Sequence, residues 1–137
     1  MSEAENKSLI KSFQSSLERK FKGEEVDLEP FFTQDVVWHI PQSNVSVATC
    51  VGREQVLALF SGVVSDYYQP QTLRFDYQAF TAEGDRVSML FTLSAITARG
   101  DEYKNQYHSL FRLEAGRIAE TWEVFDTAYL YAMMSPE

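Results

Sequence analysis

The chain has 137 residues, 45% of them hydrophobic and 23% charged, which fits a single domain over residues 1–137 whose core needs no disulfide or structural metal. Its formal net charge of -8, with no cluster of Lys or Arg, excludes a nucleic-acid partner, because phosphate binding needs a basic face. The single cysteine, Cys50, excludes an internal disulfide, and its apolar neighbours indicate a packing role.

The first residues, Met1–Glu5, are polar and acidic, unlike a signal peptide, and no apolar run is long enough to cross a bilayer. We therefore expect a cytoplasmic protein without a membrane partner. Aromatic residues make up 14% of the chain, a surplus that suits a large core, an apolar cavity or an oligomer face.

The first predicted element is an amphipathic helix in which every fourth residue from Leu9 to Phe21 is apolar. Ser2 and Glu5 have the spacing of a capping box at its start, and Gly23 is a natural stop. A second, short helix is expected to begin at Asp27.

The next predicted elements are a strand over Val36–Ile40, stopped by Pro41, and a third helix that opens at Gly52. The apolar residues of this third helix follow helical spacing as far as Tyr67. Between these two elements, the polar segment Gln42–Val51 is expected to be a loop or a flap over a site.

From Gln71 onward the apolar residues alternate with a period of two. Tight turns separate the runs Arg86–Ala98, Tyr103–Leu113 and Arg117–Asp126, so the strands are expected to form an antiparallel meander. The tail Thr127–Met134 is predicted to be a final helical turn capped by Asp126. The order α-α-β-α-β-β-β-β indicates an α+β fold with helices packed on one face of a curved, mostly antiparallel sheet.

The last strand carries an ionisable residue, Glu123, in a bulky apolar run. Alternation places Thr121, Glu123 and Phe125 on one face of the sheet and Trp122 and Val124 on the other. A carboxyl group in this position lies either on a solvent-exposed face of the sheet or in a pocket that perturbs its pKa.

Three local motifs resemble those of SnoaL-like domains in the nuclear transport factor 2-like superfamily, which also includes ketosteroid isomerase and limonene epoxide hydrolase. They are the first-strand text Asp35–Pro41, the helix opening Gly52–Val56, and the closing pair Gly116–Ile118 with Glu123–Thr127. The resemblance implies a cone in which three helices from the N-terminal half pack on a strongly curved sheet around an apolar pocket. It does not settle the chemistry, because the superfamily contains enzymes and binding modules.

The resemblance also suggests which residues are functional. Glu123 and Arg86 fall where limonene epoxide hydrolase has a catalytic Asp and its orienting Arg, but the second Asp corresponds to Ser88. The oxyanion-binding Tyr and Asp of ketosteroid isomerase correspond to Phe13 and Ser109. Neither of those two reactions is therefore expected.

His39, near the position of the isomerase's base, is a candidate base or proton shuttle. Glu123 is its candidate partner carboxylate and Arg86 the residue that orients it. Each has a structural alternative: His39 lies on the outer face if the register is shifted by one, and Glu123 pairs with Arg86 or Arg112 in an ion-pair network. The expected ligand-contacting residues, with a packing role as their alternative, are Trp38, Asn105, Tyr107, Ser109, Phe13, Phe125 and Phe60.

These features predict a small-molecule-binding protein of SnoaL-like type. The expected activity is a cofactor-independent proton transfer, like that of an isomerase or cyclase, on a mostly apolar carbonyl compound. The alternative is a non-catalytic ligand-binding or dimerisation module. Neither a cofactor nor a metal site is predicted, because the two histidines are far apart in the chain.

The strand Arg86–Ala98 has one strongly apolar face, containing Val87 and Met89, and one mixed face, containing Ser88 and Leu90. If the mixed face lines the cone, the apolar face is left on the convex side of the sheet. An apolar sheet face of that size normally meets another subunit, which predicts a homodimer through the convex faces.

Overall fold

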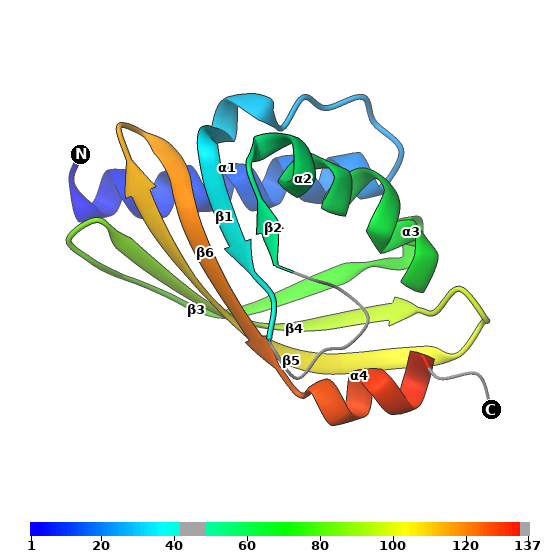
Figure 1. The fold of residues 1–137 in the computed structure, drawn as a ribbon. Coiled ribbons are helices and arrows are strands. Elements are labelled where there is room, and N and C mark those ends of the chain that lie inside the picture. The colour runs from blue at the N-terminus through cyan, green and yellow to red at the C-terminus, as the bar shows by residue number, and fades with distance from the viewer. Residues whose placement is uncertain (42–48, 135–137) are drawn as a thin grey trace.

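The computed structural model describes residues 1–41 and 49–134. It has an α+β fold in which a strongly curved, open, six-stranded sheet wraps around helices on its concave side (Figure 1). The helices are α1 (Glu3–Phe21), α2 (Arg53–Ala58), α3 (Val64–Tyr67) and α4 (Thr127–Met134). The strands are β1 (Phe32–His39), β2 (Cys50–Val51), β3 (Arg74–Glu83), β4 (Arg86–Ile96), β5 (Glu102–Glu114) and β6 (Arg117–Phe125).

Helix α1 begins with the predicted capping box. The Ser2 hydroxyl accepts a hydrogen bond from the Glu5 backbone N–H at 3.0 Å, and the Glu5 carboxylate accepts one from the Ser2 N–H at 2.8 Å. The helix ends before Gly23, which has a φ of +98°. The apolar stripe of α1 is buried against β3 and β4.

The second predicted helix is a single 3-10 turn, Glu29–Phe31. The Asp27 carboxylate accepts a hydrogen bond from the Glu29 N–H at 3.0 Å, so it caps a turn and not a full helix. The chain is already extended at Phe32, where β1 begins.

The third predicted helix is present as a continuous run from α2 to α3. Its two α-helical parts are joined by one π-helical turn, Leu59–Val63. Gly52, with a φ of +89°, turns the chain from β2 into α2, and this helical run covers the β1 side of the concave face.

The sheet order is β2-β1-β6-β5-β4-β3. Strands β3 to β6 form the predicted antiparallel meander, whereas β1 runs parallel to β6. The short strand β2 pairs with β1 and was not predicted. It consists of the last two residues of the segment Gln42–Val51, and most of that predicted loop or flap, 42–48, lies outside the described residues.

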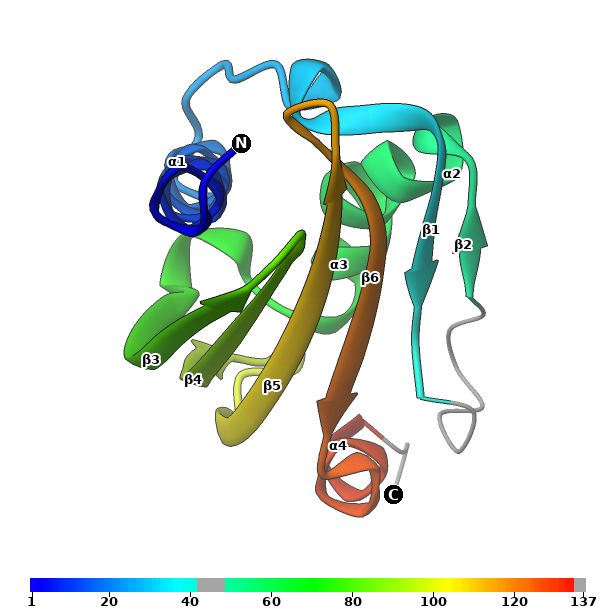
Figure 2. The same cartoon turned by 90° about the vertical axis from the view of Figure 1, so that its left-hand side faces the viewer.

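Figure 2 shows the sheet from its edge, with α4 lying across the end of β6. The predicted cap of α4 is present, because the Asp126 carboxylate accepts a hydrogen bond from the Tyr129 N–H at 3.0 Å. Among the described residues, no helix is both long and apolar enough to cross a membrane.

The two faces of the sheet differ in composition. Val87, Met89, Phe91 and Leu93 of β4 are all buried on the concave face. The premise of the dimer prediction was therefore wrong, because the strongly apolar face of β4 lines the cone and the mixed face containing Ser88 is convex.

A cluster of aromatic rings in the core is packed around Phe13. This ring is fully buried and lies 5.4 to 6.4 Å, between ring centroids, from five other aromatic rings. Those rings are Phe31, Phe32, Trp38, Phe60 and Phe111. Edge-to-face contacts of this kind stabilise a core beyond the area that they bury.

Candidate functional site

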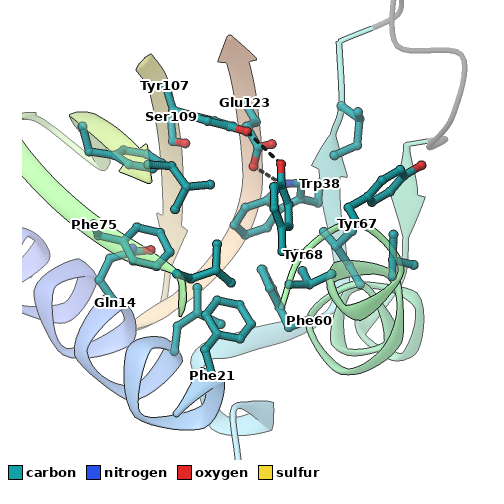
Figure 3. Close-up of a pocket in the computed structure, with 18 of the residues that line it drawn as sticks. Gln14, Phe21, Trp38, Phe60, Tyr67, Tyr68, Phe75, Tyr107, Ser109 and Glu123 are labelled. Carbon is teal, nitrogen blue, oxygen red and sulfur yellow. Dashed lines mark hydrogen bonds between the residues drawn. The ribbon is translucent and has the colours of Figure 1, made fainter. Parts of the chain in front are cut away.

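A cavity of about 130 Å³ lies between the helices and the concave face of the sheet (Figure 3). Its lining is mainly apolar, and its polar side chains are few. An apolar cavity of roughly 150 Å³ holds one benzene ring, so this volume suits a small organic molecule. The lining residues are Gln14, Leu17, Phe21, Trp38, Ile40, Leu59, Phe60, Val63, Val64, Tyr67, Tyr68, Leu73, Phe75, Met89, Phe91, Leu93, Tyr107, Ser109, Phe111, Glu123 and Leu130.

Glu123 is the charged residue of this lining. The alternation of β6 turns its side chain inward with that of Thr121, as the sequence predicts. The residue as a whole is half-buried, and protein atoms surround its carboxyl group. Burial raises the pKa of that carboxyl to about 7, and a hydrogen bond donated by the Trp38 indole N–H at 3.2 Å offsets part of the rise.

The hydroxyl groups of Tyr68 and Tyr107 are also at the cavity wall (Figure 3). Their oxygens are 3.4 Å apart, and the Tyr107 oxygen is 2.7 Å from that of Tyr103. Burial, followed by the neighbouring tyrosines and to a smaller extent the Glu123 charge, raises the pKa of both Tyr68 and Tyr107. These hydroxyls remain protonated at neutral pH and act as hydrogen-bond donors.

The cavity brings together five of the residues predicted from the sequence. They are Trp38, Phe60, Tyr107, Ser109 and Glu123.

Three other predicted ligand contacts lie near the cavity without lining it. Phe13 is in the packed aromatic core, and Phe125 packs on the Tyr107 ring with 4.6 Å between centroids. Asn105 is on the concave face but lies behind Tyr103, to whose hydroxyl its side chain donates a hydrogen bond.

His39 lies on the convex face, the alternative that the sequence left open. Its ring stacks on Trp122 with 5.3 Å between centroids, and its Nε2 is 2.6 Å from a carboxylate oxygen of Glu120. This hydrogen bond, followed by contacts with Arg112, holds the pKa of Glu120 below its usual range. Because β1 turns the neighbouring Trp38 inward, His39 points away from Glu123 and the prediction that the two work together was wrong.

Arg86 is likewise on the convex face, where it lies over the Trp122 ring at 5.5 Å from the centroid and 3.8 Å from an Asp85 carboxylate oxygen. The prediction that Arg86 orients Glu123 was wrong, because successive residues of β4 point to opposite faces and the neighbouring Val87 is the one that points inward. The alternative ion pair with Arg112 is also contradicted, because Arg112 pairs with Glu120 and Glu114.

Sequence reasoning missed several polar and apolar members of the site. Gln14 follows Ile10 by four residues on the buried stripe of α1, a signal that was available. Tyr68 lies just after the predicted third helix and Leu130 in the C-terminal helix, where no local pattern indicates which element they meet. Within the described part of the chain, no three His, Cys, Asp or Glu residues are grouped so that they can hold a metal ion.

The family model of the SnoaL-like domain matches residues 22–121. The chain belongs to the SnoaL-like domain family. No curated protein sequence matches this SnoaL-like domain.

Solved structures share its nuclear transport factor 2-like fold. A nuclear transport factor 2-like protein of unknown function from Burkholderia pseudomallei K96243 is 22% identical, with a TM-score of 0.79 over 99% of this chain and 100% of the other. A protein described as a SnoaL-like polyketide cyclase from Jannaschia sp. CCS1 is 21% identical, with a TM-score of 0.74 over 98% and 95%. TerC, co-crystallised with polyporic acid, is 18% identical, with a TM-score of 0.76 over 94% and 97%.

Proposed function

We propose that this SnoaL-like domain is an enzyme that moves a proton within a small, mostly apolar carbonyl compound, with Glu123 as the acid and base. One observation carries the proposal: Glu123 is a carboxyl group on the wall of an apolar cavity, and burial raises its pKa to about 7. A group with such a pKa gives and takes protons at neutral pH without a large penalty in either direction.

The reaction needs no cofactor. The ionised Glu123 carboxylate takes a proton from the carbon next to the carbonyl, and the electron pair of the broken C–H bond moves to the carbonyl oxygen as an enolate forms. The protonated Glu123 then returns the proton to the same carbon or to another carbon of the conjugated system, and the carbonyl forms again. Tyr107 and Ser109, adjacent inward residues of β5, are polar contacts for the substrate.

The family and a structural neighbour support a small-molecule ligand. TerC, which has the same fold, was crystallised with polyporic acid, and the Jannaschia protein is described as a polyketide cyclase. The apolar lining of the cavity favours a ligand whose surface is largely carbon.

Hydrogen–deuterium exchange of 2-tetralone in D₂O, followed by NMR, tests this proposal. We expect the protein to accelerate exchange of the protons next to the carbonyl, and Glu123→Gln to lower the rate by roughly a hundredfold or more. Glu120→Gln, on the convex face of the same strand, is the matched control and should retain the rate. Exchange that survives in Glu123→Gln refutes the role of Glu123.

The second candidate is a binding module without catalysis, which the packed aromatic cluster around Phe13 beside the cavity favours. In the same experiment, this candidate predicts saturable binding of 2-tetralone with no acceleration of exchange.

We also propose a homodimer through the convex face of the sheet. Four apolar side chains are neighbours there across β4, β5 and β6, and Val124 is 54% exposed. They are Leu90, Leu110, Trp122 and Val124. Size-exclusion chromatography with light scattering should give a dimer at micromolar concentration, and Val124→Asp should give a monomer. A monomeric wild-type protein refutes the dimer.

A further inference from the structure

Gln14 is a polar residue on the buried and mostly apolar stripe of α1. Its neighbours on that stripe, Ile10, Phe13 and Leu17, are all buried hydrophobic residues. Gln14 is itself only 3% exposed, and its side chain lines the cavity. A buried amide costs free energy unless its nitrogen and its oxygen both have hydrogen-bond partners, so the partners of this amide indicate what the cavity wall can bind.

The amide nitrogen of Gln14 is held by a row of side chains that leads away from the cavity. The nitrogen is 3.2 Å from the Tyr77 oxygen, and the Tyr77 oxygen is 2.5 Å from a carboxylate oxygen of Glu18. Burial, followed by the hydrogen bond to Glu18, raises the pKa of Tyr77, so its hydroxyl keeps its proton at neutral pH. The Glu18–Tyr77–Gln14 row therefore runs from a half-buried carboxylate to the cavity wall.

The number of protons in this row fixes the orientation of the amide. A carboxylate only accepts hydrogen bonds, and a tyrosine hydroxyl has one proton to donate. Tyr77 gives that proton to Glu18 and consequently accepts a hydrogen bond from Gln14. The group of Gln14 that faces Tyr77 is therefore the NH₂, and the amide oxygen takes no part in the row.

The amide oxygen of Gln14 is open to the cavity. Among the described residues, Tyr77 is the one hydrogen-bond partner of the Gln14 side chain, and it meets the nitrogen. In the same part of the chain, the side-chain atoms that are fully enclosed without a partner are the hydroxyl oxygens of Thr33 and Thr121. The Gln14 oxygen is thus not sealed by protein, and what it lacks is a hydrogen-bond donor.

We propose that Gln14 is a specificity-determining residue whose amide oxygen accepts a hydrogen bond from a hydroxyl group of the ligand. Figure 3 shows Gln14 reaching the cavity from α1 and Glu123 reaching it from β6, on different sides. The ligand class is accordingly a small apolar carbonyl compound with a hydroxyl group remote from the carbon on which Glu123 acts. The inference rests on the proposed function, because it describes the other end of the same substrate.

A neutral hydroxyl fits this wall better than a charged ammonium group. The lining around Gln14 is mainly apolar, so a charged donor would lose its water shell and find few groups to replace it. A hydroxyl has a much smaller cost of leaving water, and one acceptor satisfies its proton.

The test compares 2-tetralones with a hydroxyl or a fluorine at the 6- or the 7-position, the two ring positions farthest from the carbonyl. Fluorine is similar in size to a hydroxyl but donates no hydrogen bond. Isothermal titration calorimetry at neutral pH gives the affinities. We expect the wild type to bind a hydroxy compound about tenfold more tightly than the fluoro compound of the same position, the contribution of one net hydrogen bond.

Gln14→Met should abolish this difference, because methionine has a similar volume and no amide oxygen. The affinity for the fluoro compound should not fall, which a collapse of the cavity would not allow. Leu17→Met is the matched control, since it changes another cavity-lining residue of α1 that accepts no hydrogen bond, and it should keep the difference.

Tyr77→Phe tests the row and also serves if Gln14→Met does not fold. It leaves Gln14 in place but removes the hydroxyl that holds the NH₂, so the amide is free to rotate. The preference for the hydroxy compound should fall several-fold, while the affinity for the fluoro compound should stay the same. An unchanged preference in Tyr77→Phe refutes the positioning of Gln14 by the row.

Three further results separate the inference from the proposed function. Equal binding of hydroxy and fluoro compounds by the wild type refutes the acceptor site, although the proposed function stands if 2-tetralone exchanges its protons. A preference that persists in Gln14→Met assigns the hydroxyl to another group and refutes the role of Gln14. If none of the compounds binds, the small-molecule cavity itself is refuted and the inference falls with it.

Discussion

The concave and convex faces of the sheet contain carboxyl groups in opposite situations, although the two groups lie on the same strand. Glu123 is enclosed by protein and has a pKa raised to about 7. Glu120, three residues earlier and on the convex side, pairs with His39 and Arg112 and has a pKa below its usual range. Strand parity thus decides whether a glutamate on this strand is enclosed by protein and has a raised pKa, or is paired on the convex face and has a lowered one.

The largest expected difference between the two faces is in how much a substitution lowers the free energy of unfolding. Phe13→Ala should lower the free energy of unfolding by about 3–5 kcal/mol, because it removes the ring at the centre of the aromatic core. Gln106→Ala, at an exposed convex position, should change it by less than about 0.5 kcal/mol. Urea unfolding measures both, and similar losses would contradict the packing described for the two faces.

The raised pKa of Glu123 should appear in the pH dependence of the free energy of unfolding. Below its ordinary pKa of 4.5 the carboxyl is protonated in both the folded and the unfolded chain. Between pH 4.5 and about 7 only the unfolded chain ionises, so this group lowers stability by roughly 3 kcal/mol as the pH rises. Glu123→Gln should remove that loss and be more stable than the wild type at pH 8. If the free energy of unfolding of the two proteins depends on pH in the same way, the Glu123 carboxyl is exposed to water in the folded protein, and the raised pKa is refuted.

The β5–β6 hairpin sets the register that gives each residue its face, and its turn is strained. Ala115 has a φ of +51° and Gly116 one of +76°, as a two-residue hairpin turn requires. Ala115→Gly should raise the free energy of unfolding by about 0.5–1 kcal/mol. Ala98→Gly, in the β4–β5 connection, should lower the free energy of unfolding, because φ is not positive at Ala98 and glycine only adds flexibility to the unfolded chain. Thermal unfolding of both variants checks the two signs.

The smallest effect on the free energy of unfolding is expected for Glu120, the carboxyl group on the convex face. Its pKa is shifted in the opposite direction to that of Glu123. The folded-state pKa of Glu120 is lowered, so its ion pairs contribute stability above the unfolded pKa and lose it as the pH falls through the folded pKa. Glu120→Gln should cost about 0.5 kcal/mol at pH 7 and nothing at low pH, because the pair is partly exposed. A stabilising effect at pH 7 would contradict the assigned pair.

The features that the sequence predicted well are those set by neighbours in the chain. The capping box of Ser2 and Glu5, the meander from β3 to β6 and the inward turn of Glu123 each follow from spacing within one element or hairpin. The Asp126 cap of α4 is of the same kind.

The errors arose where a residue had to be assigned to the concave or the convex face of the sheet and the neighbouring sequence did not indicate which. Trp38 and His39 are adjacent in a strand and were both assigned to the pocket, which alternation forbids. Arg86 was placed by resemblance, although its neighbour Val87 belongs to the buried face of β4. Tyr68 and Leu130 escaped notice because the contacts that bring them to the cavity are with residues distant in the chain.

The parallel pairing of β1 with β6 also has a consequence for the order of folding. The indole of Trp38 and the carboxyl of Glu123 are 85 residues apart in the chain, and they meet across this pairing. Such long-range contacts close late, since most of the polypeptide must be in place before they form. During synthesis on the ribosome, Trp38 and the proposed acid–base group Glu123 therefore cannot meet until β6 has emerged from the exit tunnel.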